Sequence, residues 1–329
     1  MRGAIAILSA FAALVPGSAS LSSAHDPPPV TVRIAVAVVP ESAYFIAAHR
    51  FKRTVEKALP GRYAVAVHHS GTLGGELDIL RQVQRGSVQM AITSTGPIES
   101  FVPEIRALEM PFLFPSYEAA DKVLDGPIGA DLLRRLGKAG FTGLRFLDNG
   151  FRNVTNSRRR VRTPEDLKGL KIRTMESPSH MALWKTLGAD VVPMAWPIDA
   201  ELRKGSIDGQ ENPVAIIYGA NLAEAGQRHL TLTRHVYSAA VITANKAFMD
   251  RMPVKDREVF LAAAKDASMA GRAYVRGNEA KQLASLADAG VEIERNPDVA
   301  AFRSKASSVP AALSGDARKI HEEIRKAVR

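Results

Sequence analysis

The alternation of apolar and polar residues predicts a series of strands and helices in the first third of the chain. Residues 31–39 are apolar and β-branched, residues 63–68 alternate, and residues 89–93 form a short apolar run, so each predicts a strand. Residues 43–59 and 76–85 carry apolar side chains at helical spacing. This strand–helix–strand–helix–strand order predicts crossover connections and a mostly parallel sheet.

The ends of these strands are the predicted place for a ligand, because sites in such sheets lie beyond the carboxyl ends of the strands. We therefore expect the loops after Val39, His69 and Ile92 to line a cleft. The second of these loops contains the stretch from Gly71 to Gly75. It predicts a tight strand-to-helix turn with glycines at positive φ, rather than a phosphate site.

A second α/β unit is predicted to begin at Asn149-Gly150, after a helix at 119–136 and a strand at 142–147. Thr163-Pro164-Glu165-Asp166 is typical of a helix start, with a capping residue, proline at the first position and acids in the first turn. The unit continues with predicted strands at 169–174, 190–194 and 207–210 and predicted helices at 179–187 and 198–204.

Two long elements indicate how the units are joined. Residues 229–243 form a long strand-like stretch that is expected to cross back between them. Residues 254–289 are nearly all helix formers, and about 35 residues at 1.5 Å each give a helix of roughly 50 Å. Such a helix is too long for one small domain. A short strand at 291–294 and helices at 298–313 and 315–329 follow.

Together these elements predict a two-lobed α/β architecture. Each lobe is expected to be a mostly parallel sheet flanked by helices, with one long helix that spans both lobes. We expect lobe I to comprise residues 25–149 and about 239–278, and lobe II to comprise residues 150–238 and about 279–329. Several chain crossings between lobes suit hinge closure on a ligand.

The first 24 residues predict a secretory signal peptide. Arg2 is followed by an apolar run over residues 4–15, and Ser22-Ser23-Ala24 forms a small-x-small cleavage site before His25. A run of about 12 residues falls short of the roughly 20 that span a bilayer. We therefore expect an exported protein that is cleaved near Ala24.

Composition excludes some classes of site. The chain has no cysteine, so disulfides, thiolate metal sites and cysteine nucleophiles are excluded. Its formal net charge of +10 raises the question of nucleic acid. However, the densest basic run, Arg158 to Arg160 with Arg162, has no interleaved aromatic residue, and export argues against nucleic acid. That run is interpreted as a solvated rim.

Motifs for catalysis or cofactors are missing from the sequence. It has no phosphate-loop lysine motif, no dinucleotide fingerprint and no Gly-x-Ser-x-Gly elbow, and His321-Glu322-Glu323 lacks the second histidine of a zinc helix. His68-His69 has no third ligand in sight, so no metal is expected there. We expect no cofactor.

Arg173 is the strongest candidate for binding chemistry. It comes near the end of an apolar strand, and the alternation points it from the sheet edge into the cleft. Arginine holds a carboxylate through two parallel hydrogen bonds. The alternative is a structural ion pair with Asp166 or Glu176, and the sequence leaves the two interpretations at even odds.

Two further residues are ambiguous. Pro213 keeps Asn212 extended, so its amide is placed to donate to the same carboxylate, although an Asn-Pro turn is the commoner explanation. The acids Asp208 and Glu211 are interpreted as turn residues. Trp196 follows a Pro-Met turn, where it would either wall a pocket or belong to the core, with the pattern slightly favouring the core.

Several stretches together resemble the solute-binding proteins of tripartite ATP-independent periplasmic (TRAP) transporters, the DctP type. Three motifs occur in order: Thr-Pro-Glu-Asp-Leu-Lys-Gly-Leu-Lys-Ile-Arg at 163–173, Leu-Gly-Ala…Val-Pro-Met at 187–194, and Asp-Gly-Gln-Glu-Asn-Pro at 208–213. Residues 69–91, 110–129 and 232–248 are also similar to the family. The resemblance covers nearly the whole chain after the signal peptide.

The resemblance implies a periplasmic binding protein without catalysis. Such a protein would be a monomer that closes on a small organic acid and delivers it to membrane permease subunits. Arg173 matches the arginine that pairs with the carboxylate, and Asn212 matches the asparagine beside it. The other implied ligand-site residues are Arg152 as a second arginine, Trp196 at a position usually held by phenylalanine, and, with less support, Ser94, Glu176 and Tyr237.

One segment departs from the family pattern. After Pro-Met the family usually has Phe-Ser-Glu-x-Tyr, whereas this chain has Trp196-Pro197-Ile198-Asp199 and lacks the glutamate. The substrate of relatives is therefore not transferred. Two other functions stay open: a binding protein that presents its closed form to a signalling receptor, and a small hydrolase or lyase that uses Arg173 as an electrophilic clamp.

Overall fold

The structure, a computed structural model, describes residues 28–329. The predicted signal peptide and its cleavage site lie outside the described residues. Within them, no helix combines the length and the apolar character needed to cross a membrane. The strands are β1 Val30–Ala35, β2 Tyr63–His68, β3 Met90–Ser94, β4 Phe141–Asn156, β5 Lys171–Thr174, β6 Asp190–Pro193, β7 Gly209–Pro213, β8 His229–Asn245 and β9 Glu292–Glu294.

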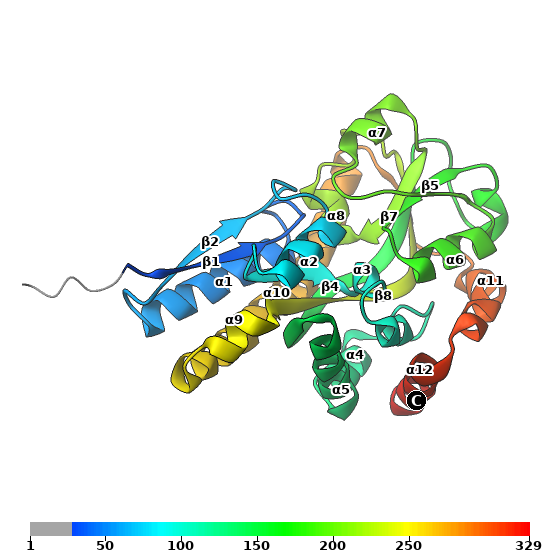
Figure 1. Cartoon of the computed structure of the whole chain (residues 1–329). Helices are drawn as coiled ribbons and strands as arrows, with labels where there is room; N and C mark the ends of the chain where they lie inside the picture. Colours follow the sequence, from blue (N-terminus) through cyan, green and yellow to red (C-terminus); the bar gives the residue numbers. More distant parts are fainter. Residues whose placement is uncertain (1–27) are drawn as a thin grey trace, which may run out of the picture.

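Helices cover the sheet formed by these strands (Figure 1). The α-helices are α1 Ala43–Ala58, α2 Glu76–Arg85, α3 Thr95–Ile98, α4 Tyr117–Leu124, α5 Pro127–Arg135, α6 Pro178–Leu187, α7 Asp199–Lys204, α8 Val214–Gly219, α9 Lys246–Arg251, α10 Val254–Asp288, α11 Val299–Lys305 and α12 Gly315–Ala327. Short 3₁₀ helices lie at Pro103–Leu108, Leu136–Ala139, Pro164–Leu167 and Ala306–Ala312.

The sheet has two parallel parts joined by two long antiparallel strands. Its order is β2-β1-β3-β8-β4-β7-β5-β6, and β9 pairs with β8. β2, β1 and β3 are parallel at one end, and β7, β5 and β6 are parallel at the other. β4 and β8 run antiparallel through the middle of the molecule (Figure 1). The predicted lobe boundaries at 149/150 and 238/239 fall inside these two strands.

The prediction of a mostly parallel sheet in each lobe is confirmed, with β4 and β8 as its antiparallel complement. β2 and α2 have the predicted bounds, and most other predicted elements differ by one to three residues at their ends. The strand predicted at 142–147 is longer, because β4 continues through an irregularity at Asp148/Gly150. Gly150 has φ 120° there, a conformation that costs glycine little.

Two predictions of local structure were wrong. The helix predicted at 119–136 is two helices, α4 and α5, because Pro127 lacks the N–H that a continuous helix needs and instead begins α5. The turn predicted around Asn212 is the strand β7, in which Asn212 lies opposite Asn153 of β4. Pro213 ends that strand, where its missing donor does no harm.

The long helix α10 packs on both lobes, as predicted. Near its start, Phe260 and Ala264 are buried with side chains of α1. Near its end, Leu283 and Leu286 are buried in a separate cluster with Leu230 of β8. A single rigid helix therefore contributes to the apolar cores of both lobes.

Candidate functional site

A small cavity lies where the carboxyl ends of β1, β3, β5 and β7 meet. Its volume is about 30 Å³. Five predicted site residues line it: Ser94, Arg152, Arg173, Trp196 and Asn212. The other lining residues, which the sequence did not single out, are Ala37, Val38, Tyr44, Glu76, Asn149, Met175 and Ile216. The expected loops after Val39, His69 and Ile92 are represented in the lining by residues at or near their ends: Ala37 and Val38 after β1, Glu76 at the start of α2 and Ser94 at the end of β3.

Arg173 is a buried cation that forms no ion pair with any of the residues that the structure describes. Its side chain comes from β5, and the residue is 4% exposed. Nε and Nη2 both donate to the carbonyl of Met194, with Nε at 2.8 Å. No carboxylate of residues 28–329 lies within 4.0 Å of the guanidinium, so the ion pair with Asp166 or Glu176 that the sequence left open is not formed.

Burial and a second arginine lower the pKa of Arg173 to about 10. Burial is the main cause, and the positive charge of Arg152 adds to it, while the negative charge of Glu211 opposes the shift. At neutral pH the guanidinium is still fully charged. A buried charge of this kind is tolerated best when an anion pairs with it.

Trp196 was expected either to wall a pocket or to belong to the core, and the structure shows features of both. Its ring centroid lies 5.7 Å from the Arg173 guanidinium carbon, at a distance suited to a cation–π interaction. The half-buried side chain lines the cavity and also packs against the apolar clusters of both lobes. It is therefore both a wall of the cavity and part of the apolar packing.

Arg152 has the partner that Arg173 lacks. It comes from β4, is 1% exposed, and donates from Nε and Nη2 to the two carboxylate oxygens of Glu211 at 2.5 and 2.8 Å. This ion pair was missed in the sequence, where Glu211 was interpreted as a turn residue. Its position in a fully buried strand is the signal that could have identified it.

Glu211 belongs to a larger buried network. Its carboxylate lies 3.0 Å from His235 Nε2 and 3.3 Å from His180 Nδ1, and His180 Nε2 lies 2.9 Å from Glu109. Burial would raise the pKa of Glu211, but Arg152 and His180 hold it well below its usual value. Burial would likewise lower the pKa of His180, but Glu211 and Glu109 raise it to about 9.

Glu76, at the start of α2, also lines the cavity. The Ser94 N–H and hydroxyl donate to its two carboxylate oxygens at 2.6 and 2.5 Å. Burial nevertheless raises the pKa of Glu76, because it outweighs these hydrogen bonds and the attraction of Arg152 and Arg173. Ser94 thus lines the cavity while both its N–H and its hydroxyl donate to Glu76.

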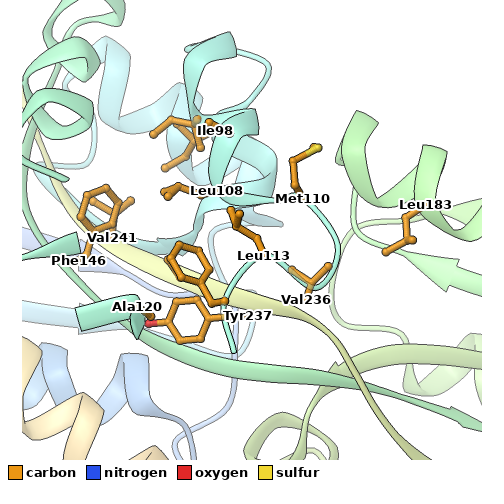
Figure 2. Packing of buried hydrophobic residues seen from close by; sticks show 14 of the residues in the cluster. Ile98, Leu108, Met110, Leu113, Ala120, Phe146, Leu183, Val236, Tyr237 and Val241 are labelled. Atoms are coloured by element: carbon orange, nitrogen blue, oxygen red, sulfur yellow. The ribbon is translucent and has the colours of Figure 1, made fainter. Parts of the chain in front are cut away.

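The remaining predicted ligand-site residues are Asn212, Glu176 and Tyr237, and only the first of them lines the cavity. Asn212 lines the cavity, and its amide donates to Gln210 Oε1 at 2.5 Å. Glu176 is partly exposed and does not line the cavity. Tyr237 lies in the core, with its hydroxyl donating to Asp148 Oδ1 at 2.7 Å. Figure 2 shows its ring among Leu113, Ala120 and Val236, so its polar tip and apolar body are both satisfied away from the cavity.

The glycine-rich loop at residues 71–75 lies against the segment that carries Trp196. Gly71 and Gly74 have the positive φ that was predicted, at 67° and 94°. Gly75 does not, and its role is close approach, because a Cβ atom there would lie 2.8 Å from the Cβ of Ala195. The loop before α2 is therefore in contact with the loop that carries Trp196.

The structure gives no indication of a metal centre within residues 28–329, where no group of three or more histidine, aspartate or glutamate side chains is placed to hold an ion. The lining residues offer the chemistry of binding: the buried Arg173 cation, amide and hydroxyl groups, and an aromatic wall.

Comparison with known proteins identifies the family. The model of the bacterial extracellular solute-binding protein family 7, DctP, matches residues 34–314. The chain is 42% identical over 273 residues to a solute-binding protein of Verminephrobacter eiseniae, covering 83% of this chain and 81% of the relative.

Two solved structures are also similar. One is a TRAP periplasmic solute binding protein from Polaromonas sp. bound to D-erythronate, at 38% identity, TM-score 0.86, and coverage of 91% of this chain and 98% of the other. The second is a TRAP periplasmic solute binding protein from Bordetella bronchiseptica with density interpreted as pantoate, at 35% identity, TM-score 0.86, and coverage of 91% and 99%. The chain therefore belongs to the bacterial extracellular solute-binding protein family 7, the binding proteins of TRAP transporters, which are transport proteins and not enzymes.

Proposed function

We propose that the protein captures a small organic acid by its carboxylate in the cavity between the lobes and delivers it to a TRAP membrane permease. We further propose that residues 1–24 are the signal peptide that directs it to the periplasm, where it acts as a monomer. Uptake of a labelled acid by cells, with and without the permease genes, tests the delivery step.

The observation that carries this proposal is the state of Arg173. A guanidinium has five N–H donors, and the carbonyl of Met194 occupies only part of this capacity. The charge is buried and no carboxylate of residues 28–329 neutralises it. A ligand carboxylate would supply both the missing negative charge and the missing acceptors.

The proposed site has further groups for the rest of the ligand. The amides of Asn212 and Asn149 and the carboxylate of Glu76 offer polar contacts, and Trp196, Met175 and Ile216 offer apolar ones. The acids named for the two similar structures, D-erythronate and pantoate, both carry hydroxyl groups beside the carboxylate, and pantoate also carries two methyl groups. They are therefore the first probes to use.

Closure is part of the proposed mechanism. A cavity of about 30 Å³ holds little more than a water or two, since one water needs on the order of 10–15 Å³. The conformation described is thus closed, with Gly75 against Ala195, and the lobes must separate to admit an acid. Small-angle scattering should show a larger radius of gyration for the ligand-free protein than for the protein saturated with acid.

Substitution of Arg173 tests the assignment of the carboxylate site. We expect Arg173→Ala to weaken binding of D-erythronate or pantoate by about a hundredfold to several thousandfold, because it leaves the ligand charge unpaired. Arg173→Lys should also bind much more weakly, since it loses the two-pronged geometry. Calorimetry measures both, with Arg160→Ala on the exposed rim as the control. Binding of the acid by folded Arg173→Ala within a few-fold of wild type would contradict the proposal.

A further inference from the structure

The charges that line the cavity bear on how many carboxylates its ligand carries. Within residues 28–329 the acidic and basic residues that line the cavity are Arg152, Arg173 and Glu76. No lysine or histidine lines the cavity in this part of the chain. Any anionic group of a ligand must therefore be matched by one of two arginines.

One of these arginines is already neutralised. Glu211 holds Arg152 through two side-chain hydrogen bonds at 2.5 and 2.8 Å, and its own carbonyl accepts a third from Nη2. The pair is buried, and His180 and His235 also contact the Glu211 carboxylate. Freeing Arg152 for a ligand would leave Glu211 without its main partner, which is costly in a buried site. Arg173 is the one lining cation left for a ligand.

The lining also contains one acidic residue of the described chain, Glu76. Glu76 is fixed by two hydrogen bonds from Ser94, so its carboxylate stays at the cavity when a ligand enters. Two carboxylates that share a small buried site cannot both ionise without a large cost. Hydroxyl groups, in contrast, can donate to the free lone pairs of Glu76. Glu76 in the lining thus favours hydroxyls and disfavours a second carboxylate.

We infer that the site takes hydroxylated monocarboxylates and rejects dicarboxylates of the same length, and that Glu76 is the residue that sets this specificity. The inference rests on the proposed function, because it assumes that Arg173 receives the ligand's carboxylate. It goes further by limiting the ligand to a single negative charge.

Matched pairs of acids provide the test. Meso-tartrate differs from D-erythronate only in its fourth carbon, which is a carboxylate instead of a hydroxymethyl group. In the same way, 3,3-dimethylmalate is the diacid that corresponds to pantoate. Calorimetry on the wild type should give a monoacid affinity about a hundredfold higher than that of its diacid in the pair that binds, as expected for an unpaired buried charge.

The variant Glu76→Gln should reduce this preference about tenfold or more, mainly by admitting the diacid, since the amide removes the like charge while its oxygen can still accept from Ser94. Asp78→Asn is the matched control. It removes an exposed carboxylate from the same helix, and the preference should not change.

The outcomes separate this inference from the proposed function. Wild-type binding of a diacid within threefold of its monoacid overturns the inference even if Glu76→Gln fails to fold. An unchanged preference in folded Glu76→Gln overturns the role of Glu76. Either result leaves the proposed function standing if Arg173→Ala still binds neither the monoacid nor the diacid of the pair that the wild type binds. Failure of all four acids to bind the wild type overturns the ligand class, and the proposed function is then judged from the effect of Arg173→Ala on whatever acid co-purifies.

Discussion

Two arginines reach the same cavity from the strands on either side of β7, and they meet different partners. Arg152, on β4, is paired with Glu211 and connected through it to His180, His235 and Glu109. Arg173, on β5, has a backbone carbonyl and the ring of Trp196 as its neighbours. Both side chains are at least nine-tenths buried, so burial alone does not distinguish them.

From this difference we infer that the Arg152 charge serves the fold and that the Arg173 charge is available to a ligand. The Arg152 network is saturated: its charges alternate in sign, and each group contacts a group of opposite charge or a hydrogen-bonding partner. Removing one member would strand another in the core. Arg173 has no carboxylate within ion-pair distance among residues 28–329, so we expect its loss to affect binding much more than folding. The following predictions test this division.

The largest effect is expected in the network. Glu211→Gln removes the carboxylate that pairs with Arg152 and contacts both histidines, and it leaves a buried cation uncompensated. The free energy of unfolding should fall by about 3–5 kcal/mol. Urea denaturation measures this, and Glu292→Gln is the control, because it removes an exposed carboxylate that also lies beside a histidine, His229. A loss for Glu211→Gln no greater than that of the control would show that the network does not stabilise the fold.

A smaller effect is expected from the titration of His180. Burial lowers its pKa, but Glu211 and Glu109 override this and raise it to about 9, above the unfolded value of 6.5. The resulting stabilisation is complete below about pH 6.5 and is lost as the pH rises through about 9. We expect the free energy of unfolding to fall by about 1–3 kcal/mol over this interval.

The variant His180→Gln isolates this contribution. Its free energy of unfolding should be lower at pH 6.5 and should change less between pH 6.5 and 9 than that of the wild type. Denaturation curves at several pH values measure both quantities. Equal pH slopes in the two proteins would show that His180 is not held in its charged form.

The smallest effect on stability is expected at Trp196, on the Arg173 side of the comparison. The chain has two tryptophans, and the other, Trp184, is fully buried with its ring 5.1 Å from that of His235 in the network. Trp196→Phe should cost less than about 1.5 kcal/mol of stability, because the half-buried site can adjust. It should abolish the change in fluorescence when D-erythronate or pantoate binds, whereas Trp184→Phe should keep that change. Retention of the signal in Trp196→Phe would place Trp196 outside the binding event.

Local patterns were sufficient for much of the fold. The two-residue and 3.6-residue periods identified β2, α2, β6 and α10 nearly to the residue, and the order of the elements predicted parallel strands with a site at their carboxyl ends. The length of α10 alone indicated that one helix reaches both lobes. These features depend on residues that are close in sequence, so the sequence determines them directly.

The partner of each charged group depends on tertiary structure. Arg152 and Glu211 meet because β4 and β7 pair antiparallel with Arg152 opposite Pro213, across 59 residues of chain. Asp166 and Glu176 are closer to Arg173 in sequence, yet neither pairs with it, and Tyr237 is satisfied by Asp148 in the core. Residue type and spacing establish that a side chain can bind a carboxylate. Strand register and helix packing decide whether the protein itself supplies that carboxylate, and on this basis we propose that Arg173, and not Arg152, receives the ligand.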